Sequence, residues 1–84
     1  MGMAMAVYKI YPKEGHDINA LFNELQKHPR VKSLKKEPIA FGLELIKIGV
    51  LMDDKKDKPE EIEADIRRID GIGEMECEDV TLIS

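Results

Sequence analysis

The sequence has few of the residues on which catalytic, metal and redox sites are usually built. Its 84 residues include one cysteine, two histidines, four aromatic residues and no tryptophan. A single cysteine excludes an internal disulfide and any Cys-x-x-Cys site, and no glycine-rich phosphate loop is present. The only serines are Ser33 and Ser84, so no Ser/His/Asp set can be proposed. We therefore expect a protein that is not an enzyme and that uses no cofactor or metal.

Long hydrophobic runs are also missing. No apolar stretch approaches the ~18 residues of a membrane span. Residues 1–6 have no charged side chain and lead into a strand-like pattern, which is unlike a signal peptide. One unpaired cysteine suits a reducing compartment. These features predict a cytoplasmic protein with a single domain over residues 1–84 and no membrane contact.

The charge is unevenly distributed along the chain. Residues 1–30 and 31–58 carry net charges of +1 and +2, whereas residues 59–84 carry nine acidic residues against two arginines. A partner that follows a phosphate backbone needs the opposite sign. The acidic end indicates a solvated surface or a basic protein partner rather than direct nucleic acid binding.

The first half of the chain reads as strand, helix and strand. Residues 4–11 are rich in β-branched and aromatic residues and end at Pro12. Asp17 can cap a helix that ends near His28. Its apolar stripe has helical spacing and consists of Ile18, Leu21, Phe22 and Leu25. Residues 31–37 then form a polar strand, which suits a sheet edge.

The second half repeats this order. Residues 43–52 make the longest apolar run and predict a central strand, whose inward face is Ile46, Ile48, Val50 and Met52. A helix follows from Pro59, and Gly71 is expected to stop it. In the last strand Met75 and Cys77 should face inward, and a bulge near Asp79 should restore the alternation.

The β-α-β-β-α-β order predicts a ferredoxin-like α/β sandwich. Two crossovers joined in this way give a four-stranded antiparallel sheet with both helices on one face. Each helix has a single apolar stripe, which agrees with one covered surface.

Several chemically suggestive residues have a stronger structural interpretation. Cys77 alternates with exposed residues and reads as core packing rather than as a reactive thiol. The acidic residues of the loop after the central strand are Asp53, Asp54 and Asp57. Lysines are interspersed among them, so we interpret this segment as a solvated loop rather than a cation site. We interpret both histidines, His16 and His28, as surface residues.

Stacked aromatics for RNA are not expected either. Tyr8 and Tyr11 differ by three positions and therefore face opposite sides of the first strand. The central strand has no aromatic residue. Together with the acidic C-terminal third, this disfavours an RNA-recognition domain.

The segment between the second and third strands is the most unusual. Pro38, Ile39, Ala40, Phe41 and Gly42 form an apolar tip where hairpins normally carry polar turn residues. Phe41 either folds back over the end of the sheet as core or projects as an anchor for a partner. Both interpretations fit the sequence.

At this segment the chain resembles the elongation factor 1-beta family in its short, archaeal form. The run from Glu37 to Leu43 is similar to the signature of that family. Other segments occur in the same order as in that family. They are Pro12 after the first strand, the acidic turn that begins at Met52, the stretch Ile69-Asp70-Gly71-Ile72 before the last strand, and the ending Glu78-Asp79-Val80-Thr81.

The resemblance implies guanine-nucleotide exchange on elongation factor 1-alpha, a GTPase that delivers aminoacyl-tRNA. We expect the protein to be a monomer. By position, Phe41 is the apolar anchor, and its loop is fixed by Pro38, Ile39, Ala40 and Gly42. The resemblance also implies that Val80, Thr81 and Leu82 belong to a C-terminal strand that approaches the nucleotide site. Glu44 stands where a basic residue is common, and the C-terminal lysine implicated in eukaryotic relatives has no counterpart here.

Two alternatives remain open at this stage. The fold and the shortage of catalytic residues also suit a regulatory or ligand-sensing module that acts as a homodimer. A divergent RNA-binding domain is the third hypothesis, and it would show salt-dependent RNA affinity.

Overall fold

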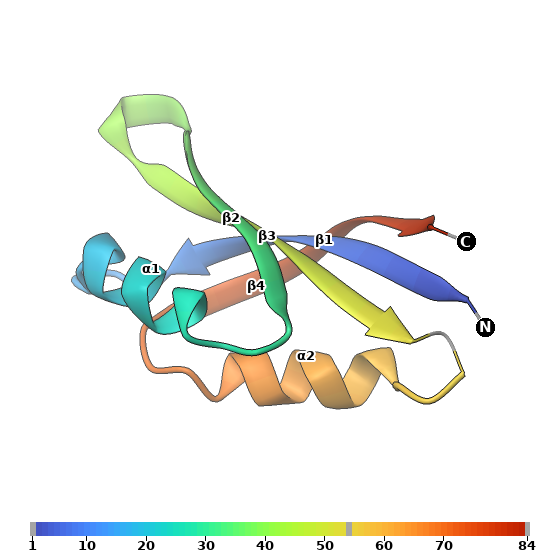
Figure 1. The fold of residues 1–84 in the computed structure, drawn as a ribbon. Helices are drawn as coiled ribbons and strands as arrows, with labels where there is room; N and C mark the ends of the chain where they lie inside the picture. The colour runs from blue at the N-terminus through green and yellow to red at the C-terminus, as the bar shows by residue number, and fades with distance from the viewer. Residues whose placement is uncertain (1, 54, 84) are drawn as a thin grey trace.

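The computed structural model describes residues 2–53 and 55–83 (Figure 1). Predictions that involve Met1, Asp54 or Ser84 lie outside these residues. The elements in chain order are β1 (Met3–Pro12), α1 (Ile18–Gln26), β2 (Val31–Pro38), the 3-10 turn η1 (Ala40–Gly42), β3 (Glu44–Asp53), α2 (Pro59–Arg67) and β4 (Ile72–Leu82).

The strands form one antiparallel sheet in the order β2-β3-β1-β4. Both helices lie on the same face of that sheet (Figure 1). This arrangement confirms the predicted ferredoxin-like fold. It also confirms that the polar strand lies at an edge and that the longest apolar strand is central.

The core lies between the sheet and the helices. Alternate residues of β1 and β3 face inward and are buried, because side chains alternate between the two faces of a strand. These residues are Ala4, Ala6, Tyr8, Ile10, Ile46, Ile48, Val50 and Met52. The stripes of both helices cover them through Leu21, Leu25, Ile62 and Ile66. The predicted inward face of the central strand is therefore confirmed.

Both helices begin as the sequence indicates. The Asp17 carboxylate accepts a hydrogen bond from the Asn19 amide at 2.9 Å and caps α1. Pro59 occupies the first turn of α2. The predicted end of α2 is wrong, because the helix ends at Arg67, four residues before Gly71.

Gly71 lies outside the helix and contacts the turn after β1. Its φ is +100°, and a Cβ built there would lie 2.3 Å from Nε2 of His16. Its carbonyl accepts a hydrogen bond from the Lys13 amide at 2.7 Å. Gly71 therefore joins the turn before β4 to the turn after β1, where a side chain would collide with the imidazole.

A bulge interrupts β4 where the alternation changes phase. Val7 pairs with Asp79 and Tyr8 pairs with Cys77, which leaves Glu78 as the additional residue. This confirms the bulge predicted near Asp79. Cys77 faces the helical side opposite Tyr8, yet it is exposed, so the prediction that it packs in the core is wrong. The reason is that β4 is an edge strand, and Met75 is its only buried residue.

Two polar contacts fix the end of the sheet near Asp53. Arg30 forms a two-pronged ion pair with Asp57, at 2.6 and 2.9 Å. Asp57 also accepts a hydrogen bond from the Asp53 amide at 2.7 Å. These contacts lower the pKa of Asp57, first through the guanidinium and then through the amide. The loop after β3, which we predicted to be solvated, is therefore anchored at Asp57.

His28 also departs from the prediction that it is a surface residue. Its side chain is only 9% exposed, and Nε2 lies 2.8 Å from a carboxylate oxygen of Asp65. Nδ1 accepts a hydrogen bond from the Arg30 amide. His28 thus links the end of α1 to α2.

Candidate partner-binding site

The hairpin between β2 and β3 is closed by its own backbone. The Ile39 amide donates to the Leu43 carbonyl at 2.8 Å, and the Leu43 amide donates to the Ala40 carbonyl at 3.3 Å. Phe41 and Gly42 both have left-handed backbone conformations, with φ of 63° and 74°. Gly42 accepts this conformation readily, whereas a residue with a side chain is disfavoured in it by about 1–2 kcal/mol.

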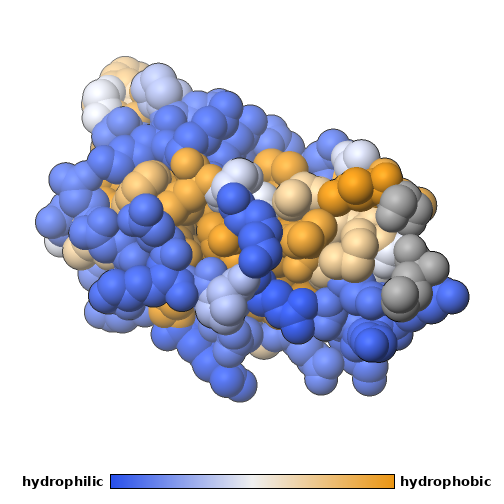
Figure 2. Space-filling model, viewed as in Figure 1, coloured by the Kyte–Doolittle hydropathy of each residue, from blue (hydrophilic) through white to orange (hydrophobic). Residues whose placement is uncertain are grey.

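This strained turn holds Phe41 outward. Its side chain is 98% exposed, so Phe41 is not part of the core. Ile39 and Leu43 beside it are also exposed. The tip stands clear of the sheet in Figure 1, and in Figure 2 its pale and orange atoms rise above a hydrophilic surface. The hairpin therefore presents an aromatic side chain that no other part of the described chain covers.

A small hollow lies at the base of this hairpin. It has a volume of about 320 Å³, and it is bounded by the turn after β1 and by the start of β3. Its walls include Pro12, His16, Ile18 and Leu43. The hydrogen bond between Lys13 and Gly71 fixes the turn that forms one wall.

The C-terminal strand exposes a second apolar surface. Val80 is 56% exposed and Leu82 is 71% exposed, and Ile83 beyond them is also uncovered. Val80 pairs with Ala6 and Leu82 pairs with Ala4. Both side chains therefore lie on the helical side of the sheet, at its uncovered edge. Orange atoms mark this area near the C-terminus in Figure 2.

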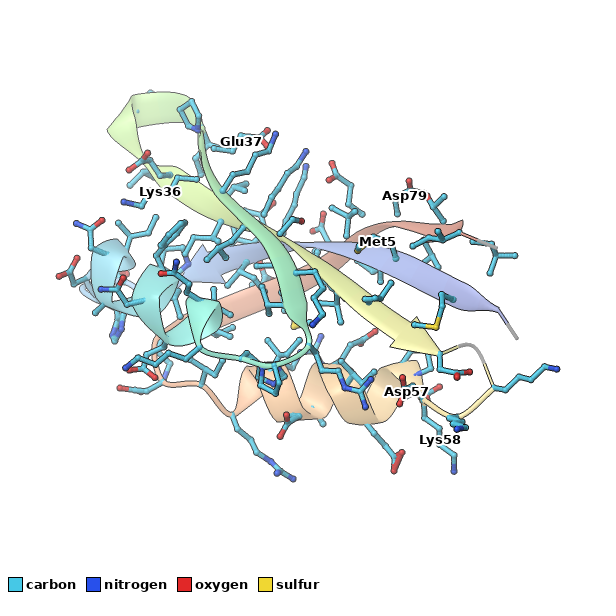
Figure 3. All side chains as sticks on the ribbon, in the orientation of Figure 1. Met5, Lys36, Glu37, Asp57, Lys58 and Asp79 are labelled. Carbon is cyan, nitrogen blue, oxygen red and sulfur yellow. The ribbon has the colours of Figure 1, made fainter. Side chains whose placement is uncertain are left out.

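The two halves of the predicted site lie at opposite ends of the sheet. Leu82 pairs with Ala4, which pairs with Met52, whereas the hairpin begins where Pro38 pairs with Glu44. Met52 follows Glu44 by eight residue steps along β3, a length of about 26 Å at ~3.3 Å per residue. Figure 3 shows the same separation, with Lys36 and Glu37 toward the hairpin and Asp57 and Lys58 at the other end.

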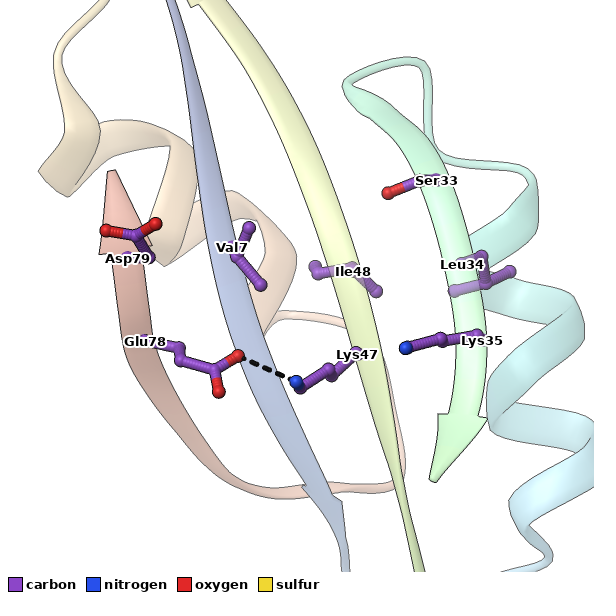
Figure 4. A pocket seen from close by; sticks show the side chains of 8 residues that line it. All are labelled: Val7, Ser33, Leu34, Lys35, Lys47, Ile48, Glu78 and Asp79. Atoms are coloured by element: carbon purple, nitrogen blue, oxygen red, sulfur yellow. Dashed lines mark ion pairs between the residues drawn. The ribbon is translucent and has the colours of Figure 1, made fainter. Parts of the chain in front are cut away.

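Between these ends, the face of the sheet opposite the helices carries a chain of ion pairs. Nζ of Lys47 lies 3.2 Å from Glu37 and 3.1 Å from Glu78, and Lys9 lies 3.7 Å from Glu78. The two carboxylates raise the pKa of Lys47 above its ordinary value. Figure 4 shows the Lys47–Glu78 pair in a hollow of about 600 Å³ that also includes Val7 and Asp79.

Sequence reasoning missed this network. Lys9 and Lys47 occupy outward positions of strands whose inward positions are apolar, which was an available signal. Glu78 could not be placed, because its direction depends on the bulge. The network neutralises much of the positive charge that the two inner strands bring to this face.

The described residues expose apolar side chains at the hairpin and along the end of β4. Among residues 2–53 and 55–83, no group of three histidine, cysteine or acidic side chains could hold a metal ion. No helix in the same part of the chain is long and apolar enough to cross a membrane. The arrangement presents a projecting aromatic side chain at one end and an uncovered strand edge at the other.

Comparison with known proteins agrees with the resemblance seen in the sequence. Several archaeal proteins named Elongation factor 1-beta match almost the whole chain. The protein from Methanospirillum hungatei JF-1 is 34% identical, and the alignment covers 99% of this chain and 100% of that protein. The protein from Methanoculleus marisnigri is 33% identical with the same coverage.

The fold has a solved counterpart. The crystal structure of PH0061 superposes with a TM-score of 0.66 at 26% sequence identity. The superposition covers 99% of this chain and 53% of that one, so the present chain spans about half of the length of the solved chain. Residues 5–83 match the EF-1 guanine nucleotide exchange domain. The chain therefore belongs to the family of EF-1 guanine nucleotide exchange domains.

Proposed function

We propose that this protein promotes the release of GDP from translation elongation factor 1-alpha and so supports the delivery of aminoacyl-tRNA during elongation. The family supports this function. The single observation that carries the site is Phe41, which is 98% exposed on a left-handed backbone. A strained backbone that exposes an aromatic side chain is typical of a functional position, and aromatic side chains are frequent binding anchors.

Exchange requires differential binding and no covalent step. The factor binds the nucleotide-free GTPase more tightly than the GDP-bound form, and by reciprocity it lowers the affinity for GDP by the same factor. Two contacts about 26 Å apart suit this task. A rigid protein held at two distant points favours one relative placement of the two regions that it touches, and therefore one state of the GTPase.

The proposed contacts are assigned as follows. Phe41 inserts into a pocket of the GTPase, and its loop is shaped by Pro38, Ile39, Ala40 and Gly42. The C-terminal strand approaches the nucleotide site through Val80, Thr81 and Leu82. The chain acts as a single domain and a monomer in the cytoplasm, without covalent catalysis and without direct contact with nucleic acid or membrane. The acidic C-terminal third and the ion-paired lysines of the sheet support the absence of nucleic acid contact.

The test is the release of a fluorescent GDP analogue from the cognate elongation factor 1-alpha. Substoichiometric amounts of this protein should accelerate release in the presence of excess unlabelled GDP, because an exchange factor turns over. The matched control is Lys27→Ala, which changes an exposed residue between α1 and β2, outside the hairpin and β4. A release rate that stays constant up to micromolar concentrations of this protein would rule out the function.

The monomer is tested separately by sedimentation of the free protein. A mass near 9.6 kDa at high concentration agrees with the proposal. A stable dimer would instead favour the homodimeric ligand-sensing module that the fold also allows.

A further inference from the structure

The outer edge of β4 presents unpaired backbone groups next to its exposed apolar side chains. β4 pairs with β1 and has no strand on its other side among the described residues. The Ile83 amide donates to the Met3 carbonyl at 2.8 Å. In an antiparallel pair, residues that bond to the partner alternate with residues whose N–H and C=O groups turn away. Thr81 therefore also bonds toward β1, whereas Val80 and Leu82 direct their amide groups outward.

The side chains of the same two residues lie uncovered on the helical side of this edge. Val80 and Leu82 are more than half exposed, and α2 does not cover them. A docked strand could hydrogen-bond to both amides while its own apolar side chains pack beside Val80 and Leu82. Backbone bonds supply affinity and side chains supply specificity when a strand is added in this way.

The charge of the edge limits what can dock. β4 carries Glu74, Glu76, Glu78 and Asp79 and has no basic residue. Only Glu78 among these forms an ion pair between described residues. The opposite edge, β2, carries Lys32, Lys35 and Lys36 and ends at Pro38. Lysine and proline protect an edge from stray pairing, whereas the acidic edge attracts a basic segment.

A second copy of this chain is a poor occupant. Two β4 strands side by side would bring acidic residues together, and like charges directly opposite are destabilising. The basic β2 edge of another copy has the correct sign, but that contact is head-to-tail, so it continues from copy to copy into a ring or a filament and does not pair two chains. A complex of two chains through this edge needs a different partner.

We propose that β4 receives an extended basic segment of the GTPase as a fifth strand, with hydrogen bonds to the backbone of Val80 and Leu82. This inference rests on the proposed function and specifies how its C-terminal contact is made. The hairpin anchor and the added strand then bind the same partner by two different types of interaction.

Amide hydrogen exchange of the complex with nucleotide-free elongation factor 1-alpha tests the geometry directly. In the free protein the amides of Val80 and Leu82 should exchange quickly, and those of Thr81 and Ile83 should exchange slowly. In the complex, exchange at Val80 and Leu82 should slow about tenfold or more, because both amides enter a ladder. Simple burial of their side chains would not produce protection at these two amides and leave their neighbours unchanged.

A pair of variants separates the backbone from the side chain. Leu82→Pro removes the outward amide and leaves the bonds to β1, which an edge strand tolerates. Leu82→Ala removes most of the side chain and keeps the amide. Leu82→Pro should bind about fivefold more weakly than Leu82→Ala, the equivalent of one hydrogen bond of about 1 kcal/mol. Thermal unfolding of both variants shows whether each is folded, and the exchange experiment uses the unaltered chain.

A second pair tests the charge. Glu74→Gln with Glu76→Gln should slow association at low ionic strength, whereas the matched pair Lys32→Gln with Lys35→Gln on the opposite edge should not. Equal effects of the two pairs would contradict a basic occupant.

The outcomes distinguish this inference from the function on which it rests. A complex that accelerates GDP release but leaves the amides of Val80 and Leu82 unprotected overturns strand addition alone. Protection of these amides in the free protein at high concentration, with sedimentation above the monomer mass, identifies a second copy as the occupant and also overturns it. Absence of any complex overturns both proposals.

Discussion

At the hairpin end a closed turn projects the almost fully exposed side chain of Phe41 beyond the less exposed Ile39 and Leu43. At the C-terminal end a strand edge leaves a row of side chains and amides uncovered. The first surface depends on Phe41 and on the backbone conformation that holds it. The second is distributed over Val80, Leu82 and Ile83, and the first two belong to the strand β4. At the hairpin, a strained backbone exposes the apolar side chain. At the end of β4, apolar side chains are exposed because α2 does not cover them.

The difference has an energetic consequence. A single projecting anchor concentrates binding energy in one residue. A strand edge divides the binding energy among several side chains and hydrogen bonds. Substitutions at the two ends should therefore differ in their effect on binding, and the following predictions are chosen to break or sharpen that contrast.

The largest effect is expected for Phe41→Ala. It should weaken binding to elongation factor 1-alpha by about 2 kcal/mol or more, because an anchoring aromatic is lost. The free energy of unfolding should change by less than about 0.5 kcal/mol, since the side chain is exposed. Titration of GDP release measures the first quantity, and thermal unfolding measures the second. If the variant is instead strongly destabilised, Phe41 supports the fold and is not an anchor.

A smaller effect is expected for Leu82→Ala. Truncation of one side chain of a distributed surface should weaken binding by about 1 kcal/mol or less. The free energy of unfolding should again be nearly unchanged. Val80→Ala tests a second side chain of the same edge. The same GDP-release titration applies. A loss as large as that of Phe41→Ala would remove the contrast between the two ends.

Phe41→Gly isolates the strain. Glycine adopts the left-handed conformation readily, but it loses more chain entropy on folding. The variant should therefore be more stable than Phe41→Ala by about 0.5 kcal/mol, while both bind equally poorly. Chemical denaturation of the two variants measures this difference. Equal stability would indicate that the turn holds no strain at this position.

The smallest effect concerns pH and only the C-terminal end. The pKa of Asp57 is lowered by Arg30 and by the Asp53 amide, so this carboxylate contributes stability above its ordinary pKa of about 3.9. That contribution is lost as the pH falls through the lowered value. Thermal unfolding of the unaltered chain and of Asp57→Asn should therefore differ at pH 6 and converge toward pH 3. A difference that persists unchanged at pH 3 would show that the ion pair is not its source.

The elements of the fold could be predicted because each carries a simple period. Alternation in β1 and β3 and the stripes of the helices are local properties, and they placed the core correctly. Cys77 shows the limit of this reasoning, since alternation gives the face of a strand but not whether anything covers that face. The bulge at Glu78 was visible only as a change of phase, which located it within one residue.

The site was harder to predict for a different reason. The sequence around Phe41 fits both a core residue and an exposed one, and the 98% exposure of Phe41 on its left-handed backbone excludes the core. The separation of the two proposed contacts follows from strand directions, because β4 ends beside the start of β1 while the hairpin lies beyond the other end of β1. The Arg30–Asp57 ion pair joins residues that are 27 positions apart, and no local sequence pattern predicts it.

The additional residue in β4 bears on how sequences of this length can be aligned. Asp79 and Cys77 already pair with consecutive residues of β1, so removal of Glu78 would leave every remaining pair in register. The chain would lose two ion pairs, those with Lys9 and Lys47, and Lys47 would keep Glu37. A one-residue gap at this point is therefore compatible with the same fold and with the same outward residues at positions 80 and 82.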